Sequence, residues 1–248
     1  FGTLVEFATV TAVDLSKRPF HVTSDNGAYY GETLIIATGA TPNRLNIPGE
    51  TELTGRGVSW CATCDGWFFK EKRVVVVGGG DSALEEGLFL TRFASSVTVV
   101  HRRDTFRAGA ILQRRAREDP KMNFIYDSVV EEVLGSNSTE AVRLRNVKTG
   151  ETTLLPTDGV FIFIGHTPNS QLFRGQISMD EHGYIRADAL SQTSVPGVFA
   201  AGEVADPNFR QVVTSAGMGA AAAIRATQFL EHQHQADSTI MPSSQAPS

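Results

Sequence analysis

The chain has 248 residues, and its 22 Lys and Arg against 27 Asp and Glu give a formal net charge of −5 at pH 7. This acidity argues against a nucleic-acid partner, because nucleic-acid-binding domains usually carry a basic face. Two cysteines are too few for a disulfide-stapled scaffold, and no apolar run reaches the ~18 residues of a membrane span. The length predicts one or two domains of roughly 150 residues, with neither a nucleic acid nor a membrane as partner.

The first segment reads as strands. Residues 4–10 alternate as a β-strand does, and residues 33–38 form an apolar run before Gly39, as in a buried strand. Because the chain starts with Phe1 inside a strand pattern, we expect an N-terminally truncated fragment. Residues 40–57 are rich in proline and glycine and form a candidate domain boundary.

A βαβ unit is predicted in the middle of the chain. An apolar strand at 73–77 leads into three glycines, a helix at 81–93 and a second strand at 96–100. A second helix is expected at 112–117. The following segments then read as strands: 123–126, 129–134, 140–147 and 158–164.

The last part of the chain contains a second strand-to-glycine turn, at 197–202, and a small-residue helix at 215–230. Residues 233–248 are polar and without periodicity, so we expect a disordered tail. The class is therefore α/β, with a central βαβ domain flanked by two pieces that form a second domain.

Cys61 and Cys64 stand two residues apart. Zinc requires four ligands, and no histidine pair lies near these two thiols, so we expect no metal. The spacing favours a redox-active disulfide, since such a pair closes a small ring and lowers the pKa of one thiol. The alternative is two buried thiols without a redox role. Asp65 follows directly and is a candidate proton donor or acceptor.

The glycines fit a dinucleotide fingerprint. Gly78, Gly80 and Ala83 follow a strand and open a helix, which is the context required for pyrophosphate at a helix N-terminus. A glycine turn without a ligand is the alternative.

Four basic residues follow the second strand: His101, Arg102, Arg103 and Arg107. An NAD site would place Asp or Glu near this point to bond the ribose. Guanidinium groups instead match phosphate oxygens, so NADPH is favoured over NADH. A solvated basic loop is the alternative.

A further acid, Glu203, follows the strand-end Gly202, and the short segment Arg210, Gln211 and Val212 precedes the small-residue helix. Such an acid bonds a ribityl or ribose hydroxyl, or it caps a helix, and both interpretations stay open.

Together these motifs resemble the low-molecular-weight thioredoxin reductases, which are flavin-dependent disulfide reductases. The resemblance covers nearly all of residues 1–232. The matching segments are 37–40, 55–59, 61–66, 78–83, 101–104, 106–107, 164–169 and 196–202.

The resemblance implies FAD, NADPH, a thioredoxin substrate and a cytoplasmic homodimer. It implies a Rossmann-like three-layer NADPH domain at 44–165, inserted into an incomplete FAD domain of the same type formed by 1–43 and 166–232. Domain rotation in the family lets one flavin meet both the nicotinamide and the disulfide.

The resemblance also assigns residues. Cys64 is the flavin-proximal cysteine, Cys61 attacks thioredoxin, and Asp65 handles the proton. Asp81 and Ser82 join the nucleotide-binding residues. The residues it assigns to FAD are Thr38, Gly39, Gly202, Glu203, Arg210, Gln211 and Val212.

The sequence departs from the family at two points. The glycine-rich unit that holds the FAD pyrophosphate would lie before Phe1, so we expect the chain alone to bind FAD poorly. Glu203 stands where the family usually has Asp. A peroxiredoxin-linked flavoprotein reductase and a flavin-free NADPH-binding fragment are the alternatives; the basic cluster argues against the first, and a visible flavin band would argue against the second.

Overall fold

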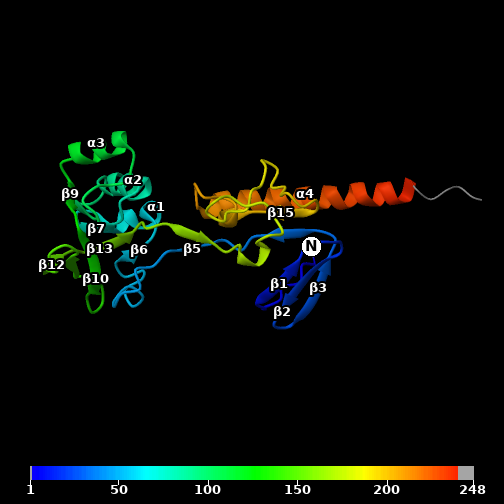
Figure 1. The fold of residues 1–248 in the computed structure, drawn as a ribbon, viewed down its shortest axis with the longest axis horizontal. Helices are drawn as coiled ribbons and strands as arrows, with labels where there is room; N and C mark the ends of the chain where they lie inside the picture. The colour runs from blue at the N-terminus through cyan, green and yellow to red at the C-terminus, as the bar shows by residue number, and fades with distance from the viewer. Residues whose placement is uncertain (1, 240–248) are drawn as a thin grey trace, which may run out of the picture. The chain divides into compact units, whose positions relative to one another are not determined.

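The computed structural model describes residues 2–239, in two compact units (Figure 1). Unit 2 is the continuous stretch Pro42–Gly165, and unit 1 combines Phe1–Thr41 with His166–Ser248. The chain therefore passes from one unit to the other twice, once before Pro42 and once after Gly165.

Unit 2 is built on a five-stranded parallel sheet. Its strands, in spatial order, are β6 (Val58–Ser59), β13 (Gly159–Ile162), β7 (Arg73–Val77), β8 (Ser96–Val100) and β9 (Met122–Ile125). Since the sheet is covered on both faces, β7 reads as a continuous apolar run rather than as an alternating strand.

Alternate valines of β7 belong to two different cores. Val74 and Val76 pack in the core beneath α2 (Asp81–Leu90) and α3 (Ala110–Glu118). Val75 and Val77 pack in the core shared with an antiparallel sheet. That sheet consists of β10 (Ser128–Leu134), β11 (Ala141–Asn146) and β12 (Thr152–Pro156). Unit 2 thus has three layers, with helices on one face of the parallel sheet and an antiparallel sheet on the other (Figure 1).

Unit 1 contains an antiparallel meander and a parallel strand pair. The meander is β1 (Val10–Asp14), β2 (Phe20–Ser24) and β3 (Gly27–Gly31), and the parallel pair is β4 (Leu34–Ile36) with β15 (Val198–Ala200). A further pair joins β5 (Ala40–Pro42) to β14 (His166–Pro168). The long helix α4 (Val212–Thr239) packs on β15, where the rings of Phe199 and Phe229 lie 6.4 Å apart.

The structure corrects the sequence prediction at both ends of unit 1. The strand expected at 4–10 begins only at Val10, because the opposing strand β2 ends at Ser24 and the pairing closes at Asp25, whose N–H bonds Thr9 O. Helix α4 exceeds the predicted 215–230 and includes residues 233–239, which were expected to be disordered. The rest of that predicted tail, 240–248, lies outside the described residues.

Strand β12 was not predicted at all, because its sequence Thr-Thr-Leu-Leu-Pro lacks an alternating or continuous apolar pattern. Within residues 2–239, no helix is long and apolar enough to cross a bilayer.

Candidate active site

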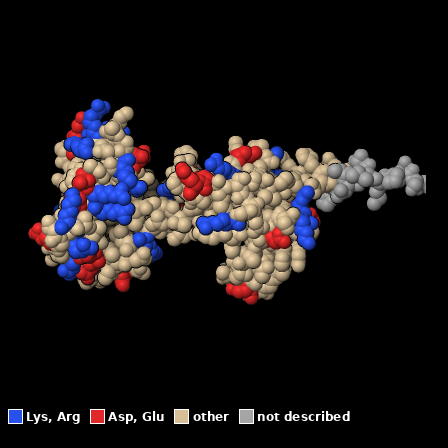
Figure 2. All heavy atoms as spheres, viewed as in Figure 1, with Lys and Arg blue, Asp and Glu red and all other residues tan. Residues whose placement is uncertain are grey.

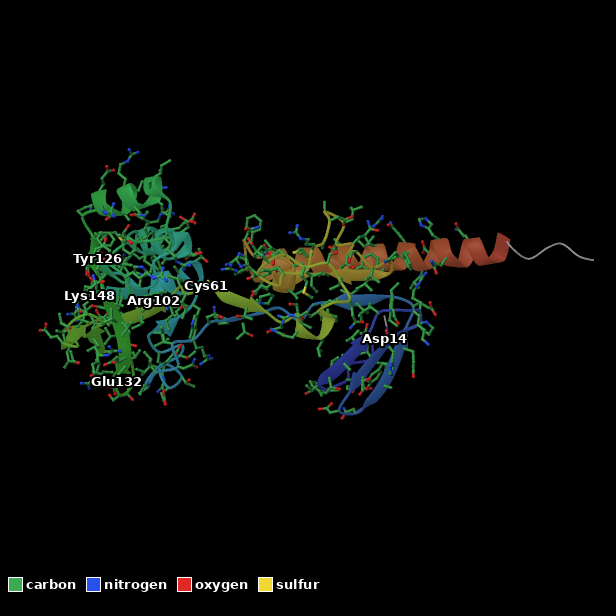
Figure 3. All side chains as sticks on the ribbon, in the orientation of Figure 1. Asp14, Cys61, Arg102, Tyr126, Glu132 and Lys148 are labelled. Carbon is green, nitrogen blue, oxygen red and sulfur yellow. A yellow bond between two sulfur atoms is a disulfide. The ribbon has the colours of Figure 1, made fainter. Side chains whose placement is uncertain are left out.

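The two cysteines form a disulfide at the start of a short helical turn in unit 2. Strand β6 ends at Ser59, Cys61 is the N-cap of α1 (Ala62–Asp65), and Cys64 lies in its last turn (Figure 3). Cys61 is half-buried and Cys64 is exposed. The described residues hold no group of three or more His, Cys, Asp or Glu that could bind a metal.

A buried hydroxyl connects this turn to the strand before it. The Ser59 hydroxyl donates to Asp65 Oδ2 at 2.6 Å and accepts from the backbone N–H of Cys61 at 3.1 Å. The first distance is typical of a hydrogen bond to a charged carboxylate. Ser59 thereby fixes both the acid and the start of the disulfide turn. Sequence reasoning missed Ser59, although its place two residues before Cys61 was visible.

The Cys61 sulfur has two polar neighbours. Its Sγ accepts the backbone N–H of Cys64 at 3.1 Å and lies 3.3 Å from the Thr63 hydroxyl. Hydrogen-bond donors at these positions stabilise a thiolate when the disulfide is reduced. This geometry favours Cys61 as the nucleophile of the pair.

Two exposed aromatic side chains follow the redox turn. Trp67 is 63% exposed and Phe68 is 69% exposed, in the 3₁₀ turn η1 (Gly66–Phe69). The Trp67 ring packs edge-on against Phe93 at 5.9 Å, and the Lys70 ammonium lies 5.7 Å from it. Large apolar side chains exposed together mark an interaction surface. The sequence prediction missed this pair.

The glycines of the turn after β7 are required for different reasons. A Cβ on Gly78 would lie 2.5 Å from Phe163 O and 2.7 Å from the Ala83 side chain, so the fold itself requires glycine there. A Cβ on Gly80 would meet nothing closer than Arg107 Nη2 at 4.0 Å. The space beside Gly80, the N-cap of α2, is open, as a pyrophosphate approaching the helix N-terminus requires.

A cavity of about 340 Å³ lies at this turn, wholly within unit 2. Figure 2 shows Lys and Arg side chains gathered on this unit, and Figure 3 marks Arg102. The chain folds back so that Arg107 N–H bonds Gly79 O at 2.8 Å. The lining includes Gly78, Gly79, His101, Arg102, Arg103 and Arg107. The structure thus brings one predicted glycine and all four predicted basic residues to one cavity.

His101 differs from the arginines, because it is buried and its pKa is lowered. Burial is the largest cause that lowers the pKa of His101, and the neighbouring arginines lower it further. Its Nε2 lies 3.0 Å from Thr105 O, and a Cβ on Gly79 would meet its ring at 2.2 Å. His101 therefore fixes the loop on the glycine turn.

The other predicted nucleotide residues lie in the first turn of α2. The Asp81 carboxylate accepts the N–H of Gly109 at 2.8 Å, which ties the basic loop to the helix. Ser82 is exposed, and Ala83 is fully buried against Gly78. Their contact with a nucleotide stays a prediction.

In unit 1, the residues predicted for flavin contact come from three segments. The Thr38 hydroxyl donates to Asn169 O at 2.6 Å, and Asn169 N–H bonds Gly39 O at 2.9 Å. Gly202 and Glu203 form the 3₁₀ turn η3 (Gly202–Val204), and Val212 is 88% exposed at the start of α4. Arg210 and Gln211 immediately precede α4.

Unit 1 also holds four buried side-chain nitrogens without a hydrogen-bond partner among the described residues: His21 Nε2, Arg225 Nε, His166 Nδ1 and Arg210 Nε. The last two lie close enough for the charge of Arg210 to act on His166. Burial and then the charge of Arg210 lower the pKa of His166 to about 4, so this histidine is neutral at pH 7. Buried polar groups are normally paired, so this pair fits the polar edge of a bound cofactor. His166 was not among the predicted site residues.

A family model described as "Pyridine nucleotide-disulphide oxidoreductase" matches residues 3–219. The chain is 51% identical over 223 residues to a thioredoxin reductase of Streptomyces coelicolor, which covers 89% of this chain and 69% of that protein. It is 52% identical over 234 residues to a thioredoxin reductase of Rickettsia felis, covering 92% of this chain and 76% of that protein.

Solved structures give the same result. A thioredoxin reductase of Streptococcus pyogenes matches with a TM-score of 0.85 and 43% identity, over 91% of this chain and 74% of that one. One from Giardia duodenalis matches with a TM-score of 0.86 and 40% identity, over 93% and 76%.

Proposed function

The chain belongs to the pyridine nucleotide-disulphide oxidoreductase family, and from this membership we propose that it is an NADPH-dependent thioredoxin-disulfide reductase that uses FAD. The observation that carries the proposal is the Cys61–Cys64 disulfide in the same unit as the arginine-lined cavity. When bound, FAD and NADPH supply the hydride chemistry that delivers two electrons to this disulfide.

The residues of unit 2 fit a phosphorylated nucleotide. The open space at Gly80 admits a pyrophosphate, and Arg102, Arg103 and Arg107 provide bidentate donors for a 2′-phosphate. We therefore assign residues 44–165 to the NADPH domain. Residues 1–43 and 166–232 form the FAD-binding part, where the partnerless His166 and Arg210 nitrogens support the assignment.

The cysteines carry the electrons to the protein substrate. The Cys61 thiolate attacks one sulfur of the thioredoxin disulfide, so a mixed disulfide forms while the other thioredoxin sulfur leaves and takes up a proton. The Cys64 thiolate then attacks Cys61, which releases the second thioredoxin thiol and re-forms the Cys61–Cys64 disulfide. Asp65, held by Ser59 at 2.6 Å, donates or accepts the proton at the thiols.

The surface beside the disulfide suits a protein substrate. Trp67 and Phe68 are exposed next to the exposed Cys64, which supports docking of a partner with an apolar patch around its own disulfide. The family resemblance supports a homodimer in the cytoplasm.

The thiol roles can be tested without turnover of the flavin. The full chain carrying Cys64→Ser is reduced and mixed with a thioredoxin in which the second cysteine of its disulfide is replaced by serine and the exposed cysteine is activated as a thionitrobenzoate disulfide. We expect release of the yellow thionitrobenzoate anion and a covalent adduct on a non-reducing gel, because Cys61 attacks and no resolving thiol remains. Cys61→Ser is the matched control and is expected to give both far more slowly.

An adduct with Cys61→Ser but not with Cys64→Ser would reverse the two roles. NADPH consumption by the FAD-loaded wild-type chain with thioredoxin tests the overall activity. Continued turnover by either serine variant would contradict the mechanism, since the described residues hold no free cysteine to take over.

A further inference from the structure

The arginine loop contains acids as well as bases. Asp104 directly follows Arg102 and Arg103, and the N–H of Asp127 bonds Arg103 O at 3.2 Å. Two carboxylates therefore lie next to the cations that we assign to a phosphate. Left alone, they would repel that phosphate and compete for the guanidinium groups.

Lys148 bridges both carboxylates from a distant hairpin. Its Nζ lies 2.9 Å from Asp127 Oδ2 and 3.4 Å from Asp104 Oδ2. Lys148 lies in the turn between β11 and β12, where the Asn146 side chain accepts its N–H at 2.9 Å. In the same turn, Val147 N–H bonds Asp127 O. The backbone thus holds the lysine opposite the loop (Figure 3).

The bridge favours the charged forms of Lys148 and Asp104. The hydrogen bond to Asp127 is the largest cause that raises the pKa of Lys148, and the hydrogen bond from Lys148 is the largest that lowers the pKa of Asp104. Lys148 and Asp104 are 59% and 67% exposed, and exposed pairs contribute little to folding stability. Global stability therefore does not explain the Lys148–Asp104 contact, although Asp127, the nearer partner, is only 20% exposed. The position of the bridge beside the phosphate-binding arginines offers a second explanation.

We propose that Lys148 is a positioning residue that sets the preference for the 2′-phosphorylated coenzyme, because it pins the loop of Arg102 and Arg103 and neutralises Asp104 and Asp127. The inference rests on the NADPH site proposed above. Lys148 would distinguish the coenzymes because only NADP(H) carries a 2′-phosphate. Without Lys148, the carboxylates of Asp104 and Asp127 would repel that group.

The test is calorimetric titration of the full chain with NADP⁺ and, separately, with NAD⁺, which reads binding without turnover. In Lys148→Met we expect NADP⁺ affinity to fall about five- to tenfold, the effect of one lost charge near a phosphate at modest ionic strength. NAD⁺ affinity should be unchanged. Lys148→Arg should restore the NADP⁺ preference, and Lys148→Met with Asp104→Asn should recover part of it by removing the unpaired carboxylate.

Arg143→Met is the matched control, because it breaks an ion pair of the same antiparallel sheet, with Glu132 at 2.9 Å. It should leave both affinities unchanged. If the wild type prefers NADP⁺ but Lys148→Met keeps that preference, or weakens both coenzymes equally, the role of Lys148 is overturned while the NADPH site stands. A wild type that does not prefer NADP⁺ overturns both the site and the inference.

Discussion

At the redox turn, one hydroxyl group holds the carboxylate and the nucleophile's backbone together. Ser59 is 5% exposed and bonds both Asp65 and the N–H of Cys61. Ser59→Ala removes both contacts and leaves the disulfide sequence intact. We expect the reduced chain to attack oxidised thioredoxin about tenfold more slowly, since one charge-assisted hydrogen bond contributes roughly 1.5–3 kcal/mol. Adduct formation followed over time, in the Cys64→Ser background, measures this rate.

Two variants separate positioning from general damage. Ser59→Thr keeps the hydroxyl and should restore the rate. Ser128→Ala removes another buried hydroxyl of unit 2, one that bonds Tyr126 O at 2.9 Å, and should leave the rate unchanged. Equal slowing in both alanine variants would show that Ser59 acts through stability alone.

In the glycine turn before α2, the fold requires Gly79, and the proposed ligand requires Gly80. Gly80→Ala places its Cβ in open space, and we expect a stability change within about 1 kcal/mol, the typical effect at an N-cap. The same methyl group would obstruct a pyrophosphate, so NADP⁺ affinity should fall at least about tenfold, equivalent to about 1.4 kcal/mol. Thermal unfolding and calorimetry of the full chain measure the two effects.

Gly79→Ala is the comparison variant. Its Cβ would lie 2.2 Å from the His101 ring, so overpacking should destabilise unit 2 by about 1–3 kcal/mol. If Gly80→Ala kept wild-type affinity for NADP⁺, the turn would be a structural glycine turn without a nucleotide.

Elements with strong local patterns were predictable, and those defined by distant contacts were not. The run of valines in β7 and the helix after it follow from burial on both faces and from helical spacing, and both are observed. The CxxC pair and the arginines were predictable because each motif is contiguous in the sequence. Ser59 and Lys148 were missed because their significance comes from partners; Lys148 lies 44 residues from Asp104.

The whole molecule combines one continuous unit with one discontinuous unit, and this predicts which part folds alone. Every buried residue of both cores in unit 2 lies between Leu53 and Phe163. The two ends of the unit meet, because Asn43 N–H bonds Gly165 O at 3.0 Å and the Asn43 side chain bonds Ile164 O. Cutting the chain at the two ends of unit 2 should therefore expose neither of its hydrophobic cores to water.

We expect residues 42–165, expressed alone, to unfold cooperatively, to form the Cys61–Cys64 disulfide and to bind NADP⁺ within about threefold of the full chain, a difference below the ~1.4 kcal/mol of one decade. A fragment that begins at residue 60 is the control: it lacks Leu53 and β6, so it should lose cooperative unfolding. Circular dichroism on heating, thiol titration and calorimetry give the three readouts. An aggregated 42–165 fragment would mean that unit 1 completes the fold of unit 2. A folded fragment that binds NADP⁺ would instead mean that the nucleotide site and the redox disulfide belong to one folding unit. Residues 1–41 and 166–239 would then be needed for neither of these sites.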